Sequence, residues 1–266
     1  CYRCPYGYPD LNGEAQLEIC KTTCANFVRY VLEKEGDVAA VIAEPARAVP
    51  YLPPPGYWKM VRQACNDYGA LLIFDEIPTG LGKTGKMFAC EHDEVVPDIL
   101  VLGKALGGGI LPIAAVLAKA ELDVGGEFAF GHYTHEKNPV TAKAALTTIE
   151  IIEQEGLVEN AAVLGKYMLE KLNLLKAEHP SIGDVRGRGL LIGVDLVLNQ
   201  EEKTPADDLA EDVLYRCLSK GLSFKITMGN VLTLTPPLII TKTQIDLSLS
   251  IIEESLSEAE EASGLV

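Results

Sequence analysis

The sequence predicts an α/β fold, with a large domain built on a mainly parallel sheet and a smaller C-terminal α+β domain. Up to about residue 120, short apolar runs alternate with segments of helical period, which is typical of parallel strands joined by helices. From Leu157 the pattern changes to a long helical period, and a separate segment from Val185 to Leu198 follows it. We therefore expect two domains, covering residues 1–156 and 157–266.

The first domain contains four short apolar runs, which predict strands near residues 38–43, 70–75, 98–103 and 113–118. A helical period over residues 57–68 predicts a helix that ends close to Gly69. A second helix is expected from about residue 139, because Asn138 can cap it and Pro139 suits its first turn. Residues 125–137 before it are expected to form a loop.

The second domain is expected to contain a helix near 206–220, a strand pair around 222–235 and a last helix. The last helix opens with Thr241 and Gln244 in the spacing of a capping box. Acidic residues between 253 and 261 are interpreted as the solvated face of this helix.

Two residues of opposite charge follow apolar runs, and such positions carry the chemistry of open α/β sheets. Lys104 ends one run and precedes three glycines, and Asp75 ends another. A lysine partly withdrawn from water at the floor of a cleft can trap a carbonyl. An aspartate beside it can keep a pyridine nitrogen protonated. The pair suggests a pyridoxal phosphate site, and the alternative is a strand-end ion pair.

Several ordered motifs resemble those of the class III pyridoxal-phosphate-dependent aminotransferases, in residues 53–57, 72–88, 96–104, 138–139, 184–190 and 230–238. Within that class, residues 183–208 are similar to dialkylglycine decarboxylase and 4-aminobutyrate-type enzymes. The resemblance implies the type I fold of these transferases, pyridoxal 5'-phosphate as cofactor, and a homodimer with the active site at the subunit interface. It also implies transfer of an amino group from a small-molecule donor to a keto acid.

The resemblance also implies roles for individual residues. Lys104 would form the Schiff base with the cofactor and move a proton, while Asp75 would hold the pyridinium. Ile77 would pack against one face of the ring, where a β-branched side chain is stiff. Thr134 would reach the cofactor phosphate of the neighbouring subunit. Glu44 would lie beside the substrate, or its carboxylate would instead cap the turn that follows it.

Two departures from the family pattern concern the substrate. The family usually has a glutamine at position 78, where this chain has Pro78, which lacks any N–H donor. The family's carboxylate-binding arginine falls at Thr233, and a hydroxyl cannot replace a bidentate guanidinium. We therefore expect a substrate other than an ordinary α-amino acid: an amine, an ω-amino acid or an aminophosphonate. Arg47 is either a displaced positive charge or a solvated loop residue.

Alternative functions remain open beside the aminotransferase. One is a pyridoxal-phosphate-dependent lyase or decarboxylase on the same scaffold, for example one acting on an aminophosphonate. Another is a non-catalytic partner subunit that contributes only Thr134 across an interface. By resemblance the chain begins inside the large domain, so we expect a C-terminal fragment with an uncovered sheet edge and exposed apolar surface.

Composition limits the other classes of function. A net charge of −15 disfavours binding to nucleic acid or to an anionic membrane. No apolar run is long enough to span a bilayer and no signal peptide opens the chain, so we expect a cytoplasmic protein. Seven scattered cysteines do not suggest a disulfide framework. Zinc binding by Cys1, Cys4, Cys20 and Cys24 is disfavoured because no glycine-rich knuckle surrounds them, and we expect no metal.

Overall fold

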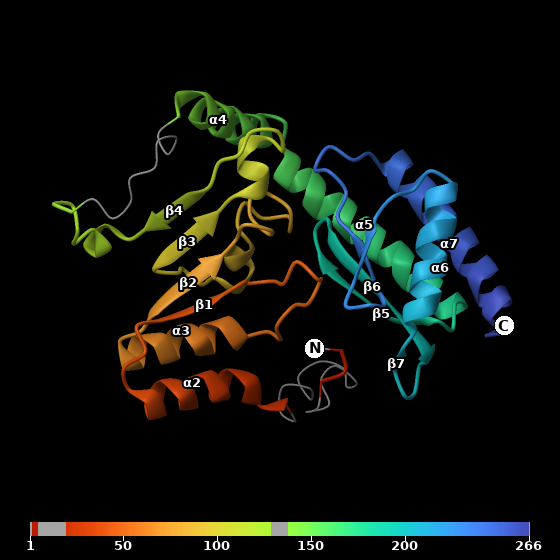
Figure 1. Ribbon diagram of the computed structural model, residues 1–266, viewed down its shortest axis with the longest axis horizontal. Coiled ribbons are helices and arrows are strands. Elements are labelled where there is room, and N and C mark those ends of the chain that lie inside the picture. Colours follow the sequence, from red (N-terminus) through yellow and green to blue (C-terminus); the bar gives the residue numbers. More distant parts are fainter. Residues whose placement is uncertain (1, 5–19, 129–137, 266) are drawn as a thin grey trace.

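The computed structural model describes residues 2–4, 20–128 and 138–265, which form two sheets with their own helices (Figure 1). The expected phosphate contact, Thr134, lies outside the described residues. The long helix α5 (Leu157–Glu178) runs from the first sheet to the second. The proposed domain boundary falls at Gly156, which caps the start of this helix, and stays a prediction.

The first sheet has four strands in the order of the sequence: β1 (Ala40–Ala43), β2 (Leu71–Asp75), β3 (Ile99–Leu102) and β4 (Ala115–Ala118). The pairs β1–β2 and β2–β3 are parallel, so the expected mainly parallel sheet is confirmed. Strand β4 runs antiparallel to β3. Only the short helix η2 (Lys104–Gly107) lies between these two strands, and a parallel return needs a longer crossover.

Helices α2 (Thr23–Glu35) and α3 (Tyr57–Tyr68) cover one face of this sheet (Figure 1). Leu72 and Phe74 of β2 are fully buried there, and Trp58 packs edge-on against Phe74. The opposite face leaves Ile42 and Val116 exposed, at 67% and 68% of their surface. This agrees with the expected uncovered apolar surface. Helix α2 is not expected from the sequence, because no side chain caps its start.

The second sheet is antiparallel, with the order β5 (Ile182–Arg188), β6 (Leu191–Asn199), β9 (Val231–Leu234) and β8 (Lys225–Thr227). A short strand, β7 (Thr204–Pro205), pairs with β6. One face of this sheet packs against α5, α6 (Asp207–Ser219) and α7 (Lys242–Ser263). Apolar side chains from these four elements form the largest buried cluster, and it includes Leu172, Ile192, Leu232 and Ile252.

The expected helix starts are confirmed by their caps. Helix α4 (Pro139–Gln154) begins where the Asn138 side chain accepts a hydrogen bond from the Val140 amide, at 2.9 Å. Helix α7 begins with the expected capping box of Thr241 and Gln244. Short 3-10 helices, η1 (Ala89–Asp93) and η3 (Ala120–Leu122), lie in the connections of the first domain. No described helix is long and apolar enough to cross a membrane.

The interpretation of the acidic tail as wholly solvated is wrong at Glu260. This residue is 2% exposed, and its carboxylate lies 2.7 Å from His179 Nδ1. It also accepts hydrogen bonds from the amide and hydroxyl of Ser181. A buried carboxylate is tolerated only with such partners. Glu260 therefore fastens α7 to the residues that lead into β5, a role that the acidic run does not indicate.

Candidate active site

Three polar side chains gather where β1, β2 and β3 end. The register pairs Ala43 with Phe74, so Glu44 leaves β1 next to Asp75, the last residue of β2. Asp75 itself pairs with Val101 of β3, and Lys104 follows three residues later. The carboxyl ends of parallel strands lie at the same edge of the sheet. The structure therefore brings Glu44, Asp75 and Lys104 to one edge, as the sequence predicts.

Lys104 has an unusual backbone at this edge. Its φ angle is 45°, in the left-handed region, which costs a non-glycine residue about 1–2 kcal/mol. Lys104 is exposed among the described residues, and the withdrawal of its amine from water stays a prediction. The chain turns into η2 directly after Gly103, which carries Lys104 out of the strand. Strained residues of this kind cluster at functional sites.

Asp75 and Ile77 form the neighbouring surface. Asp75 is half-buried, and its Oδ1 atom accepts a hydrogen bond of 3.0 Å from the Ile77 amide. Ile77 lies against Gly103, since a Cβ atom at Gly103 would be 3.5 Å from both γ carbons of Ile77. A carboxylate and a branched apolar side chain thus lie beside the backbone that presents Lys104.

The turn after Asp75 is held by Glu76, which the sequence analysis does not single out. Glu76 is buried and accepts hydrogen bonds from the amides of Ala89 and Cys90. The Thr79 hydroxyl donates to the same carboxylate at 2.7 Å. Every oxygen of Glu76 is therefore used inside the fold. Its importance comes from partners 13 and 14 positions away, which no local pattern indicates.

Glu44 takes part in the turn that the sequence analysis offers as one alternative. Its Oε2 atom accepts a hydrogen bond of 2.9 Å from the Ala48 amide. The next peptide carbonyl, of Pro45, accepts from the Trp58 indole at 2.9 Å. These contacts define a depression of about 440 Å³, and Glu44, Arg47 and Tyr51 line it. The turn-capping contact is present, and Glu44 still faces this depression.

Thr233, where the family usually has an arginine, lies in β9, an inner strand of the second sheet. It is 1% exposed, and its hydroxyl shares a hydrogen bond of 2.7 Å with Thr227. It has no free position for a ligand's acidic group. Arg186 and Arg188, interpreted as structural, form ion pairs with Asp184 and Asp93 respectively.

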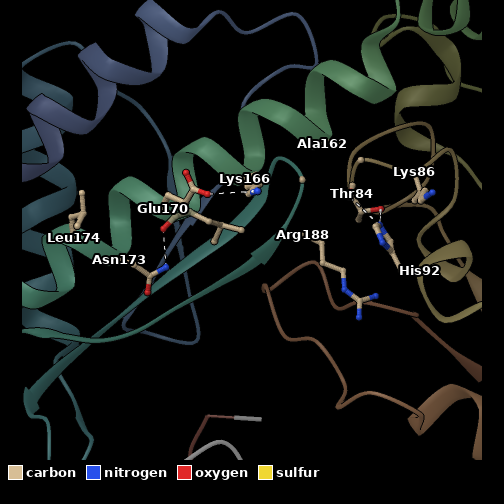
Figure 2. Close-up of a pocket in the computed structure, with 12 residues that line it drawn as sticks. Thr84, Lys86, His92, Ala162, Lys166, Glu170, Asn173, Leu174 and Arg188 are labelled. Carbon is tan, nitrogen blue, oxygen red and sulfur yellow. Dashed lines mark hydrogen bonds and ion pairs between the residues drawn. The ribbon is translucent and has the colours of Figure 1, made fainter. Parts of the chain in front are cut away.

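Another depression among the described residues lies away from the strand ends (Figure 2). It has a volume of about 850 Å³ and is formed by the Thr84–Lys86 loop, α5 and Arg188. Lys166 and Glu170 line it from α5, and His92 faces them from the other side (Figure 2). Burial and the nearby Arg188 charge lower the pKa of His92. Neither Lys104 nor Asp75 lines it, so size alone does not locate the candidate site.

Among the described residues, no group of three or more His, Cys, Asp or Glu side chains is arranged so that it could hold a metal ion. Cys20 and Cys24 are free thiols there. Cys1, the fourth residue of the disfavoured zinc alternative, lies outside the described residues.

An open α/β sheet with a lysine and a carboxylate at adjacent strand ends has the architecture of type I pyridoxal-phosphate-dependent enzymes. The chain belongs to the class III aminotransferase family, because the model of that family, Aminotransferase class-III, matches residues 1–256. Members of this family depend on pyridoxal phosphate.

Among curated proteins, the chain is 44% identical over 248 residues to (R)-1-hydroxy-2-aminoethylphosphonate ammonia-lyase of Vibrio splendidus, covering 93% of this chain and 52% of the relative. It is 42% identical over 216 residues to ornithine aminotransferase 2 of Staphylococcus aureus, covering 80% and 51% respectively. A solved Bacillus anthracis aminotransferase matches with a TM-score of 0.88 and 35% identity, over 97% of this chain and 60% of that one. The chain thus spans about half the length of these curated relatives.

The described residues fit the chemistry of pyridoxal phosphate on one side of the cofactor. Lys104 offers an exposed amine, and Asp75 offers a carboxylate whose second oxygen accepts no hydrogen bond from a described residue. Ile77 offers an apolar surface between them. Pro78 offers no hydrogen-bond donor at its position. The expected phosphate contact, Thr134, lies outside the described residues.

Proposed function

We propose that this chain belongs to a pyridoxal-phosphate-dependent enzyme that moves an amino group from an amine, an ω-amino acid or a related donor to a keto acid. The observation that carries the proposal is the arrangement of Lys104, Asp75 and Ile77 at one edge of a parallel sheet. An amine and a carboxylate partner for the ring nitrogen are groups by which proteins hold this cofactor, and Ile77 adds an apolar surface. Family membership supports the same class of reaction.

Each residue has a definite task in the proposed reaction. When bound, pyridoxal phosphate supplies an aldehyde that condenses with amines and a ring that accepts electrons. Asp75 keeps a proton on the ring nitrogen, and the Ile77 amide fixes its carboxylate. Ile77 covers one face of the ring. The Lys104 amine would hold the cofactor and would then carry the proton from the substrate carbon next to nitrogen to the cofactor.

Further parts of the proposal rest on the resemblance. Glu44 lies beside the substrate, and Thr134 contacts the phosphate bound to the neighbouring subunit. These roles require a homodimer, which light scattering on the full-length gene product tests directly. A cytoplasmic location is proposed from the composition of the chain.

Elimination is the second candidate, and two observations favour considering it. A relative with 44% identity is named as an ammonia-lyase that acts on an aminophosphonate. In addition, Thr233 removes the usual carboxylate-binding arginine of the aminotransferases. In this reaction the Lys104 amine removes the same proton, but a leaving group departs and no amino group reaches a keto acid. The third alternative, a non-catalytic partner subunit, predicts no bound cofactor.

The decisive experiment compares the visible spectrum of the full-length gene product with that of its Lys104→Ala variant. A visible band that borohydride abolishes, and that the variant lacks, is the expected result. Lys166→Ala, which removes an exposed lysine from α5, is the matched control and should retain the band. A wild-type protein without any band after addition of pyridoxal phosphate would refute the proposal. Amino transfer to a keto acid then distinguishes transamination from release of free ammonia.

A further inference from the structure

The second sheet faces the loop that carries Glu44 and Arg47, through a row of residues in register. Arg186 of β5 pairs with Gly193 of β6, Gly193 pairs with Thr233 of β9, and Thr233 pairs with Lys225 of β8. Directly opposed residues on neighbouring antiparallel strands place their side chains on the same face. The loop packs on this row, because a Cβ atom at Gly193 would lie only 3.1 Å from Pro50.

Arg186 is fully engaged in holding this loop. Its Nε atom donates to the Pro50 carbonyl at 2.7 Å, and its other nitrogens pair with Asp184 and Asp195 at 2.8 and 3.0 Å. The guanidinium also lies 4.1 Å from the centre of the Tyr51 ring. Burial alone would lower the pKa of Arg186, but these acidic partners raise it. Arg186 is therefore not free to bind a substrate.

Arg47 also has a fixed backbone, but its side chain is unengaged, unlike that of Arg186. Its amide donates to the Tyr51 carbonyl at 3.0 Å, and the two residues form an antiparallel bridge. The guanidinium is exposed, lines the depression next to Glu44, and forms no hydrogen bond or ion pair with any described residue. A cation on a backbone already fixed needs little further ordering to bind an anion.

We infer that Arg47 is the specificity-determining residue that binds the acidic group of the substrate, and that this group is a phosphonate. The inference rests on the proposed function. Thr233 cannot take this role, since its hydroxyl is buried and bonded to Thr227. A guanidinium binds a tetrahedral phosphonate through two parallel N–H donors. Arg186 is a positioning residue, because it holds Pro50 and Tyr51 and so fixes the loop that presents Arg47.

The similarity to an aminophosphonate ammonia-lyase supports the choice of a phosphonate over a carboxylate. The charges in the depression bear on the position of this group. Glu44 is a second charged side chain in the depression, and its repulsion directs an acidic group toward Arg47. A phosphonate carries more negative charge than a carboxylate near neutral pH, so the attraction to Arg47 is stronger.

The test measures binding by calorimetry in the full-length Lys104→Ala protein loaded with pyridoxal phosphate, where turnover is blocked. The probes are 2-aminoethylphosphonate and ethanolamine, which share an amine but differ in the acidic group. Adding Arg47→Gln should raise the dissociation constant for the phosphonate by roughly 10–100-fold, the usual contribution of a charge-assisted contact. The constant for ethanolamine should stay unchanged. Lys225→Gln, the exposed cation at the end of the row, is the matched control and should change neither constant.

Several outcomes would overturn the inference. These are unchanged phosphonate binding in Arg47→Gln, an equal loss for ethanolamine, no phosphonate binding before the substitution, or a loss confined to Lys225→Gln. Arg186→Lys should weaken phosphonate binding less than Arg47→Gln and leave ethanolamine binding intact. The visible band of the Lys104-containing protein tests the proposed function separately from the role of Arg47. If that band is present and Arg47→Gln binds normally, the inference fails while the proposed function stands.

Discussion

At Lys104, the backbone conformation gives a stability prediction that is independent of activity. A residue with a φ angle of 45° is strained unless it is glycine. Lys104→Gly should therefore be more stable than Lys104→Ala, by roughly 1 kcal/mol after the entropy of the unfolded glycine is subtracted. Urea unfolding of the two variants measures the difference. At Lys166, inside α5, the order should reverse, because alanine favours a helix over glycine. The same order at both positions would contradict the strain at Lys104.

Residue type and position at strand ends are enough to predict that Asp75 and Lys104 lie together, because strand register follows from the apolar runs. Exposure is less predictable. The sequence does not show that the chain leaves β3 at Gly103, so the exposed position of Lys104 among the described residues is not predicted. The expectation that Glu260 is solvated fails for a similar reason. Its partner His179 lies 81 positions earlier, and an acidic run on a last helix indicates solvent unless that contact is known.

Among the elements, Asp98 connects a helix and two strands of the first domain. Its carboxylate accepts hydrogen bonds from the Leu72 amide at 2.7 Å, from Arg62 of α3 at 2.6 Å, and from Lys119 after β4 at 2.7 Å. Burial alone would raise the pKa of Asp98, but these hydrogen bonds and the Arg62 charge lower it to about 2. The charged carboxylate is therefore favoured in the folded protein over the unfolded chain, whose aspartates titrate near pH ~3.9.

The lowered pKa of Asp98 gives a pH dependence with a definite sign. Its contribution to the free energy of unfolding, roughly 2 kcal/mol, is present above pH ~4 and is lost as the pH falls toward about 2. Asp98→Asn should lose this amount near neutral pH and show a flatter acid limb between those values. Urea midpoints across pH 2 to 7 measure it. Asp37→Asn, an exposed loop aspartate, should change little. Parallel acid limbs for wild type and Asp98→Asn would contradict the assignment.

Strands and helices with strong local signals are predicted well, and those defined by tertiary contacts are not. Helix α3 is found where the sequence predicts it, because its period and Gly69 mark both its length and its end. The antiparallel direction of β4 is not predictable from its apolar run, since either direction buries the same side chains. Helix α2 is stabilised by packing of residues such as Ala25 and Leu32 against α3, with no capping side chain at its start.

In the whole molecule, the two sheets are held together at a contact where three backbones approach closely. A Cβ atom at Gly189 would lie 2.4 Å from the Thr84 carbonyl carbon, and the Leu190 amide donates to the Lys83 carbonyl at 2.9 Å. The Lys83 side chain continues this contact by donating to the Pro236 carbonyl at 2.7 Å, and burial lowers its pKa. This junction sets the orientation of the second sheet, and with it the position of Arg186 above the loop of Arg47.

Gly165 of α5 tests this junction, because a Cβ atom there would lie 2.2 Å from the Gly189 carbonyl oxygen. Alanine favours a helix over glycine by about 1 kcal/mol. The clash is with backbone on both sides, so relief requires the sheets to shift, and overpacking of this severity costs about 3 kcal/mol or more. The cost of the clash therefore exceeds the helix preference of alanine. Gly165→Ala should lower the free energy of unfolding by roughly 2 kcal/mol. Gly126→Ala, which would meet only an Asp123 oxygen at 3.9 Å, is the control for urea unfolding. Equal stability of the two variants would mean that the junction yields without cost, and that the second sheet does not hold the Arg47 loop in one fixed position.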